Sequence, residues 1–467
     1  MICLLLFVMG GFLHGASRPN IILIMADDQG WAQTGYMNHP YLRGRTPHLD
    51  DMARSGIRFN RFYAAAPICS PTRASVLTGR APTRTGVPGL HKRLCLQEKT
   101  LSQALKNVGY VTGFFGKWHL NGVKGPGMPI LPDDPNHPGH YGFDEWLACT
   151  NFFERDPLMS RNGNFEYLEG ESSELMVREA LSFLKNHQTS PTLTVIWYGS
   201  PHHPFISDPA DREGFPEGKE GDQLGEIVAM DRSIGMLRKG LRELGIEEET
   251  LIWFTSDNGG LETDPNSVGH LKNYKGSLNE GGIRVPAIVE WPDRIEPATT
   301  DFPASTMDIM PTLVDLLDLP GDSQLAVRDG ESIKSLFNGE LPGRSHAIPF
   351  VVKGTALIDG NFKLLQNGKG KNASWVLFDL KNDPREMTNV SHQYPERYQN
   401  LIAEAQALLF SVSESSLGKD YPEGRVLQPQ RGVPWFEMKE YQRHYDTFTR
   451  LKPSWKSPRR NSRINHQ

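Results

Sequence analysis

Four apolar runs, separated by segments with helical periodicity, constrain the fold of this chain more than any other feature. They cover residues 20–25, 110–115, 192–198 and 251–255 and are rich in β-branched and long apolar side chains. Short continuous runs of this kind are typical of strands that are buried on both faces of a parallel sheet. The segments 46–56, 100–109, 173–186 and 226–244 have helical apolar spacing. This alternation predicts an α/β fold with a mostly parallel sheet sandwiched by helices.

Polar side chains follow directly after each of the four runs. They are Asp27 and Asp28, Lys117 and His119, His202, and Asp257 and Asn258. Each residue alone can be an ordinary loop or surface residue, but the carboxyl ends of parallel strands share one sheet edge, where open α/β sheets bind their ligands. Lys117 and His119 are two residues apart, so on an extended segment their side chains point to the same side. The shared position of these residues predicts a functional site.

Composition and periodicity divide the rest of the chain into segments. Residues 1–16 contain a short apolar stretch followed by small residues, which predicts a signal peptide and an exported (periplasmic or secreted) protein. This stretch is shorter than the ~20 residues of a membrane span. Residues 17–340 form the predicted α/β domain, with 120–171 as a long surface excursion. The pattern in residues 341–418 predicts a smaller antiparallel sheet with a helix at 396–409. Residues 419–467 are expected to form an irregular basic tail.

Charge and cysteine content exclude some classes of protein. The 467 residues carry a net charge of −5, which argues against a nucleic-acid partner because such proteins usually have a basic excess. The 4 cysteines provide no disulfide framework. Cys3 lies in the predicted signal peptide, and nothing in the sequence decides whether Cys95 and Cys149 pair.

The remaining cysteine, Cys69, lies in a segment that predicts a loop turning into a helix. Pro71 fits the first helical position, which places Cys69 at the helix N-terminus, where free N–H groups and the dipole favour an anion. Arg73 follows one turn later, so its guanidinium returns towards the same end. A small nucleophile beside a fixed cation suits the transfer of an anionic group. A buried, inert cysteine next to an ordinary helix is the simpler alternative.

The two acidic pairs predict a metal site. Asp27, Asp28, Asp257 and Asn258 supply four oxygen-bearing side chains, and hard oxygen ligands suit Ca²⁺ or Mg²⁺ better than zinc. Capping of helices and turns is the alternative role for each pair. Calcium is favoured if the nucleophile and substrate oxygens complete an irregular coordination shell.

A positive local charge is expected around this metal. The three carboxylates, one divalent cation and the basic residues Arg73, Lys117 and Lys275 together have a net charge of +2. Such a site attracts a sulfate or phosphate ester although the whole chain is negative. Lys275 lies in a glycine-rich loop leading into a strand, where the nearby Lys272 is a competing candidate.

Several of these segments resemble the signatures of the type I sulfatases. The run Cys69-Ser70-Pro71-Thr72-Arg73 within residues 67–80 resembles the first signature, and Gly109-Tyr110-Val111-Thr112 with Gly116-Lys117-Trp118-His119 resembles the second. The segments 27–30, 200–202, 257–259, 275–286 and 378–384 also resemble sulfatase segments, in the family's order. The similarity covers residues 19 to about 409 and is strongest to bacterial enzymes that act on sulfated carbohydrates.

This resemblance implies an alkaline-phosphatase-like fold and a role for each site residue. Cys69 would be oxidised to formylglycine by a maturation enzyme, and the hydrated aldehyde would attack sulfur. Asp27, Asp28, Asp257 and Asn258 would hold one calcium ion that an oxygen of modified Cys69 also faces. Arg73 and Lys117 would position the hydrate and Lys275 would bind the sulfate. His202, with Lys275, would protonate the leaving alcohol, and His119 would assist the release of sulfate.

Two other functions compete with sulfate-ester hydrolysis. A phosphate or phosphonate monoesterase would keep the same machinery and change the ester. A non-catalytic protein that binds sulfated glycans would keep Cys69 unmodified and use the loop only to capture anions. The combination of Cys69, Arg73, Lys117, His119 and His202 favours an enzyme, because a binding protein needs no proton donors.

Overall fold

The computed structural model describes residues 18–292, 294–340, 343–368, 373–427 and 431–456. Its centre is an 11-stranded sheet with the spatial order β11-β2-β10-β9-β1-β8-β3-β5-β6-β7, in which β12 also pairs with β2. The strands of this sheet are β1 (Asn20–Ala26), β2 (Ile57–Tyr63), β3 (Val111–Lys117), β5 (Glu145–Cys149), β6 (Leu158–Arg161), β7 (Asn164–Tyr167), β8 (Thr192–Trp197), β9 (Thr250–Ser256), β10 (Arg284–Glu290), β11 (Ala298–Thr300) and β12 (Ala304–Ser305). Neighbours from β9 through β1, β8 and β3 to β5 are parallel, whereas β10 is antiparallel to both β9 and β2. The predicted mostly parallel sheet is confirmed.

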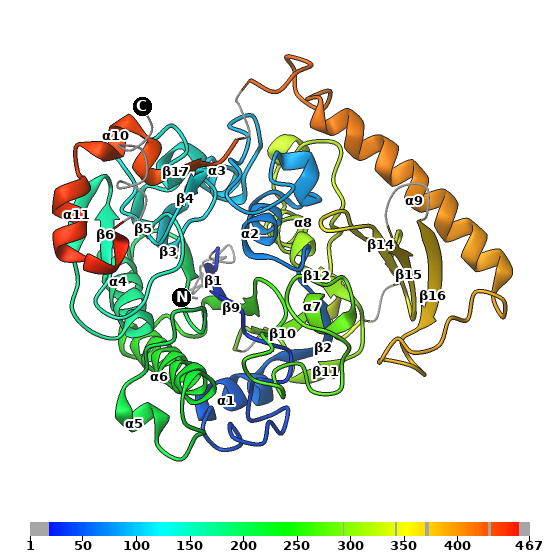
Figure 1. Ribbon diagram of the computed structural model, residues 1–467, viewed down its shortest axis with the longest axis horizontal. Coiled ribbons are helices and arrows are strands. Elements are labelled where there is room, and N and C mark those ends of the chain that lie inside the picture. Colours follow the sequence, from blue (N-terminus) through cyan, green and yellow to red (C-terminus); the bar gives the residue numbers. More distant parts are fainter. Residues whose placement is uncertain (1–17, 293, 341–342, 369–372, 428–430, 457–467) are drawn as a thin grey trace, which may run out of the picture.

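Helices cover both faces of this sheet, as predicted (Figure 1). Alternate residues of β1 point to opposite sides: Ile21, Leu23 and Met25 belong to one buried cluster, whereas Ile22, Ile24 and Ala26 belong to another. The first cluster includes residues of α2 (Cys69–Thr78), α3 (Leu101–Lys106) and α8 (Ile309–Leu316). The second includes residues of α1 (Pro47–Ser55), α4 (Ser172–Asn186) and α6 (Lys219–Leu244). Two short helices, α5 (Pro209–Arg212) and α7 (Glu280–Ile283), lie in connections.

The helix that carries Cys69 begins earlier than the sequence suggested. Ile68 is the N-cap and Cys69 is the first helical residue, so Pro71 is the third residue and not the first. Proline is tolerated there because the first four N–H groups of a helix have no partner within the helix. Cys69 therefore lies at the N-terminus of α2, as expected, but within its first turn.

The segment 120–171 is not the surface excursion that was predicted. It contains β5, β6 and β7, which extend the main sheet beyond β3. Residues such as Trp146 and Leu147 are buried within it. These strands have four or five residues each and are separated by loops rich in Pro, Gly and Asn, so their periodicity is too short to recognise.

The smaller C-terminal sheet and its helix are confirmed. Four antiparallel strands, β13 (Ile348–Phe350), β14 (Ala356–Asp359), β15 (Phe362–Asn367) and β16 (Ser374–Asp379), form a sheet in sequence order. The helix α9 (Pro395–Ser416) extends beyond its predicted end and packs Leu401 and Ala405 on one face of this sheet. The other face contacts the large sheet region through Ile348, Phe350 and Ile358.

The chain beyond residue 418, predicted to be irregular, contains regular structure up to Lys456. It forms β17 (Val433–Pro434), α10 (Lys439–Gln442) and α11 (Tyr445–Leu451). The strand β17 pairs in parallel with β4 (Val123–Lys124). Its buried aromatic residues occur at irregular spacing, so neither a helix nor a strand period reveals them. The predicted signal peptide (1–16) and residues 457–467 lie outside the described part of the chain.

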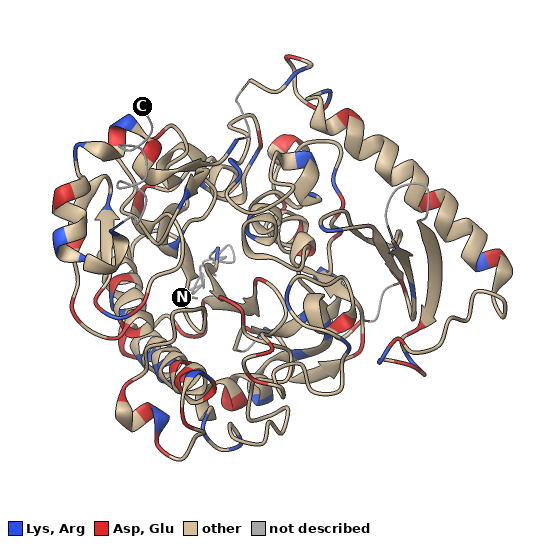
Figure 2. Ribbon diagram, in the orientation of Figure 1, with Lys and Arg blue, Asp and Glu red and all other residues tan. Residues whose placement is uncertain are grey.

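No described helix is long and apolar enough to cross a membrane. Acidic and basic residues are interspersed over the whole ribbon (Figure 2). Between the described cysteines Cys95 and Cys149 there is no disulfide, and the thiol of Cys149 donates a hydrogen bond to the Asn151 carbonyl oxygen at 3.1 Å.

Gly116 lies where the central strands β3 and β8 are packed closely together. A Cβ atom at this position would lie 1.8 Å from the carbonyl oxygen of Trp197, and the φ angle of Gly116 is +119°. We expect Gly116→Ala to lower the free energy of unfolding by about 3 kcal/mol or more, because neither the clash with backbone nor the φ angle can be relieved locally. Gly89→Ala, where a Cβ would meet no atom within 4 Å, is the matched control. Urea denaturation measures both, and equal small effects would contradict this packing.

Candidate active site

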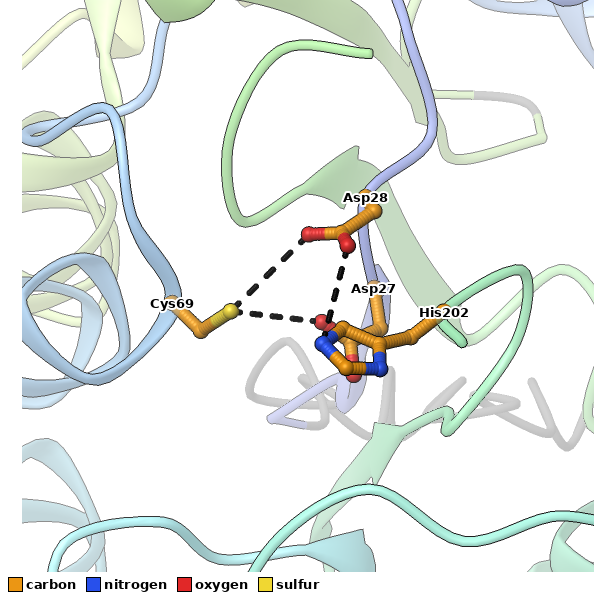
Figure 3. Close-up of side chains that lie close together, drawn as sticks. All are labelled: Asp27, Asp28, Cys69 and His202. Carbon is orange, nitrogen blue, oxygen red and sulfur yellow. Dashed lines mark hydrogen bonds and ion pairs between the residues drawn. The ribbon is translucent and has the colours of Figure 1, made fainter. Parts of the chain in front are cut away.

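The carboxyl edge of the sheet brings the predicted residues together. Asp27 and Asp28 follow β1, Lys117 is the last residue of β3, His202 follows β8, and Asp257 and Asn258 follow β9. The first residue of α2, Cys69, faces them, and its Sγ atom lies 3.5 Å from Asp27 Oδ1 and 3.9 Å from Asp28 Oδ1. Figure 3 shows the side chains of Asp27, Asp28, Cys69 and His202 converging from three separate elements. The sequence-based expectation of a site at this edge agrees with this geometry.

Asp28 adopts an unusual backbone conformation that is held by its neighbours. Its φ angle is +71°, in the left-handed region that non-glycine residues rarely adopt. Its N–H donates to Asp257 Oδ1 at 3.2 Å, and its Oδ1 accepts from Asn258 Nδ2 at 2.8 Å. The strand ends of β1 and β9 are therefore tied together at the site. Strained backbone of this kind is concentrated at functional sites.

Arg73 is completely buried and joins two of the carboxylates. Its Nη2 atom lies 2.7 Å from Asp257 Oδ2 and 3.6 Å from Asp27 Oδ1. Its Nη1 donates to the carbonyl oxygen of Lys117 at 3.1 Å, and its guanidinium lies 5.2 Å from the ring centre of Trp197. The predicted return of Arg73 towards the start of α2 is thus present in the structure.

Two lysines complete the positive side of the site. Lys117 Nζ lies 2.6 Å from Asp27 Oδ2 in a fully buried ion pair. Lys275 Nζ lies 2.5 Å from Asp28 Oδ1 and 3.4 Å from Cys69 Sγ. Lys272, the competing candidate, points elsewhere and donates to the carbonyl oxygen of Glu386 at 2.9 Å. The geometry therefore selects Lys275.

The two predicted histidines occupy different positions. His202 Nε2 lies 3.7 Å from Asp28 Oδ2, in contact with the site. His119 has a φ angle of +55° and follows the end of β3, so the extended geometry expected for Lys117 and His119 is absent. Its Nε2 lies 3.2 Å from Nδ1 of His91 instead. The backbone of His119 is therefore not extended, but its side chain remains close enough to Lys117 for that ammonium, after burial, to lower the pKa of the histidine.

Two residues that contact these histidines were not predicted from the sequence. His91 contacts His119, and its backbone N–H lies 3.4 Å from the hydroxyl of Ser70. Phe152 stacks on the ring of His202, with ring centroids 5.1 Å apart. His91 and Phe152 lie in loops outside any predicted strand end, so no positional signal identified them.

Electrostatics make the unmodified thiol a poor nucleophile. Burial, followed by the charge of Asp257, raises the pKa of Cys69 well above its usual value, so the thiol stays protonated at neutral pH. Burial opposes ionisation of Asp28, but Lys275 and His202 lower its pKa below the usual range. Burial together with the charge of Asp27 raises the pKa of Asp257. The neighbouring cations thus favour the charged form of Asp28, whereas burial and Asp27 oppose the ionisation of Asp257.

The donor set fits a hard divalent cation. Asp27, Asp28, Cys69 and His202 offer ligand atoms within 4.8 Å of one another. Asn258 Oδ1 is buried and, among the described residues, has no hydrogen-bond partner. Buried polar atoms normally have a partner, and a metal ion would be a suitable partner for this amide oxygen beside the carboxylates. The structure thus contains a candidate metal site, to which His202 adds a group that was not expected as a ligand.

The fold, with carboxylates, buried cations and a thiol at one sheet edge, is suited to an enzyme that acts on anionic esters. The chain belongs to the sulfatase family: the family model named Sulfatase matches residues 19–319, and the one named N-sulphoglucosamine sulphohydrolase, C-terminal, matches residues 272–414. It is therefore a sulfatase, which hydrolyses sulfate esters, and its fold is alkaline-phosphatase-like.

Relatives and solved structures support this membership. The chain is 35% identical over 356 residues to arylsulfatase A of Homo sapiens, covering 68% of this chain and 67% of that protein. It is 31% identical over 371 residues to N-acetylgalactosamine-6-sulfatase of Canis lupus familiaris, covering 70% and 67%. The structure of Ps i-CgsB in complex with k-i-k-neocarrahexaose has a TM-score of 0.75 and 26% identity, covering 94% of this chain and 100% of that one.

Proposed function

We propose that this sulfatase removes sulfate from sulfated carbohydrates, using a formylglycine made from Cys69 and one calcium ion. The observation that carries the proposal is the position of Cys69 Sγ, 3.4 Å from Lys275 Nζ and 3.5 Å from Asp27 Oδ1. A buried thiol with a raised pKa is an unsuitable nucleophile, and this supports its conversion before use. The conversion requires a formylglycine-generating partner, and we infer that the protein is exported.

Formylglycine would supply a hydrated aldehyde: one hydroxyl would attack sulfur, and loss of the proton from the other would re-form the aldehyde as sulfate leaves. Arg73 and Lys117 fix the surroundings of this position: both are fully buried, and both pair with Asp27. A calcium ion held there would supply positive charge for the sulfate oxygens. We assign Asp27, Asp28, Asp257 and Asn258, with an oxygen of modified Cys69, to its coordination.

Lys275 and His202 are assigned to the substrate. Lys275 remains charged because Asp28 raises its pKa against the opposing effect of burial, so its ammonium is available to bind the sulfate. Burial lowers the pKa of His202 to about 3, and an arriving sulfate anion favours its charged form. We infer that His202, with Lys275, then protonates the leaving alcohol. His119, whose pKa is lowered by burial and by Lys117, is neutral and suited to accept a proton during sulfate release.

Carbohydrate is the proposed substrate class because of the relatives. One relative is named for N-acetylgalactosamine 6-sulfate, and one structural neighbour was solved with k-i-k-neocarrahexaose. A panel of sulfated oligosaccharides and an aryl sulfate, assayed with enzyme made beside a formylglycine-generating enzyme, tests the proposal. Sulfate release from an oligosaccharide supports it. If the enzyme releases phosphate from phosphate esters and no sulfate from any sulfate ester, the site belongs to a phosphate monoesterase instead.

Removal of the metal is expected to abolish most activity. Chelation with EGTA should lower kcat/KM by roughly 100-fold or more. A metal at such a site stabilises the charge of the transition state, and this lowers the activation free energy by several kcal/mol. Chelation also leaves the buried carboxylates without the cation that offsets their mutual repulsion, so the Tm should fall. Re-addition of Ca²⁺ should restore both quantities, measured by sulfate release and by thermal unfolding. Full activity in the chelated protein, with no metal found by elemental analysis, would rule out a metal in the reaction.

A further inference from the structure

The last described segment of the chain, residues 433–456, forms a wall beside the candidate site. Its residues Trp435, Tyr441, Phe448 and Trp455 pack in one buried cluster with Val123, Met128, Leu131 and Leu158. Tyr441 donates a hydrogen bond to the carbonyl oxygen of Pro129 at 2.9 Å, and Lys452 Nζ lies 3.3 Å from Glu154 Oε1. Figure 1 shows α10 and α11 lying over the region of β6 and β17. Both family models end before this segment, at residues 319 and 414.

A cavity of about 480 Å³ lies between this segment and the loop that carries His202. Its lining includes Phe152, His203, Trp435, Trp455 and Lys456. This volume is within the range of small-ligand sites, roughly 300–1,000 Å³. The cavity has room for a ring-sized ligand.

The cavity is adjacent to the candidate active site. Phe152 lines the cavity and stacks on His202, with an angle of 15° between the two rings. His202 Nε2 in turn lies 3.7 Å from Asp28 Oδ2. A ligand in the cavity is thus separated from the site by one pair of stacked rings. The next residue along the chain, His203, belongs to the cavity itself.

The lining combines aromatic walls with one lysine at the rim, Lys456. Aromatic side chains offer large apolar faces that pack on the C–H face of a sugar ring. His203 and Lys456 are exposed at the rim, and the carboxylate of Glu154 is paired with Lys452. The ammonium of Lys456 attracts an anionic ligand. Few polar groups around an apolar pocket are typical of a site that orients a small ligand.

We propose that this cavity binds a second sugar unit of a sulfated oligosaccharide, next to the unit whose sulfate is removed. The inference rests on the proposed carbohydrate activity and adds a specificity element supplied by the C-terminal segment. It makes activity on an oligosaccharide depend on residues 433–456, whereas a substrate without a second sugar does not reach them.

Kinetics on two substrates test this subsite. The substrates are the sulfated oligosaccharide with the highest kcat/KM in the panel and 4-nitrophenyl sulfate, which lacks a second ring. Trp455→Ala removes part of a buried cluster and disturbs folding, so the variants are Phe436→Ala and Lys456→Glu, at half-buried and exposed positions of the lining. We expect a five- to tenfold higher KM (about 1–1.4 kcal/mol) for the oligosaccharide, with unchanged kcat and unchanged constants for the aryl sulfate.

The matched control is Lys439→Glu, an exposed charge reversal on α10 outside the cavity lining, which should leave both substrates unaffected. Unchanged oligosaccharide kinetics in both cavity variants, or equal losses on both substrates, would overturn the subsite while leaving the proposed function intact. A wild-type enzyme that cleaves the aryl sulfate but no oligosaccharide would overturn the carbohydrate function and the subsite together. A shift from dimer to monomer in Phe436→Ala would assign the cavity to a second copy of the chain instead.

Discussion

Cys69→Ala is expected to remove sulfate release almost completely, with a loss of roughly four to six orders of magnitude in kcat. Loss of the attacking group leaves only the catalysis that charges and binding provide, and substitutions of a nucleophile in other hydrolases have effects of this size. The side chain is small and 2% exposed, so its truncation leaves the surrounding ion pairs in place. Sulfate release at saturating substrate measures the effect.

Cys95→Ala provides the matched control for this loss. Cys95 is also buried, but its thiol hydrogen-bonds with Tyr421 and lies near Glu98, away from the carboxyl edge of the sheet. This variant should keep the wild-type kcat. Activity above a hundredth of wild type in Cys69→Ala would contradict the assignment of the nucleophile, whereas loss of activity in both variants would point to a general requirement for thiols.

Arg73→Met is expected to reduce both activity and stability. The substitution keeps an unbranched apolar stem but removes the guanidinium that pairs with Asp257 and approaches Asp27. Breaking a buried pair leaves an uncompensated charge, which lowers the free energy of unfolding by roughly 3–5 kcal/mol. The same loss disturbs Lys117, whose carbonyl oxygen accepts from Arg73 at 3.1 Å, so kcat should fall by at least about 100-fold.

Arg80→Met separates the effect on stability from the effect on activity. Arg80 follows α2, is 1% exposed, and pairs with Glu98 and Asp420, which lie outside the site. Its substitution should destabilise the fold by a comparable amount and leave the kcat of the folded protein unchanged. Urea denaturation and sulfate release, measured on both variants, give the comparison. Equal kcat losses would show that Arg73 acts through stability alone.

The elements that were predicted correctly have strong local patterns. The run from Asn20 to Met25 is apolar throughout because β1 is buried on both faces, and such a run allows few other interpretations. The C-terminal strands were recognised because turn residues separate them. By contrast, β6 and β7 have four residues each, and their pairing at the sheet edge depends on partners that no local pattern specifies.

The site was predictable to the extent that it follows strand ends. Asp27, Asp28, Asp257 and Asn258 could be placed together because β1 and β9 are parallel neighbours in the sheet. The choice of Lys275 over Lys272 depended on the resemblance, since both lie in the same irregular loop. The extended backbone expected at His119 is wrong, because this residue has a φ angle of +55° that the sequence does not indicate. The cavity formed by residues 433–456 was also missed, because a distant segment builds one of its walls.

The most direct test of the central claim is to measure sulfate release against the fraction of Cys69 that is converted. Protein preparations made with increasing amounts of a formylglycine-generating enzyme would be analysed by mass spectrometry of the peptide carrying Cys69, and their kcat per molecule determined. The account predicts that kcat rises in proportion to the converted fraction and approaches zero without conversion. Full activity in protein whose Cys69 remains an unmodified thiol would contradict it.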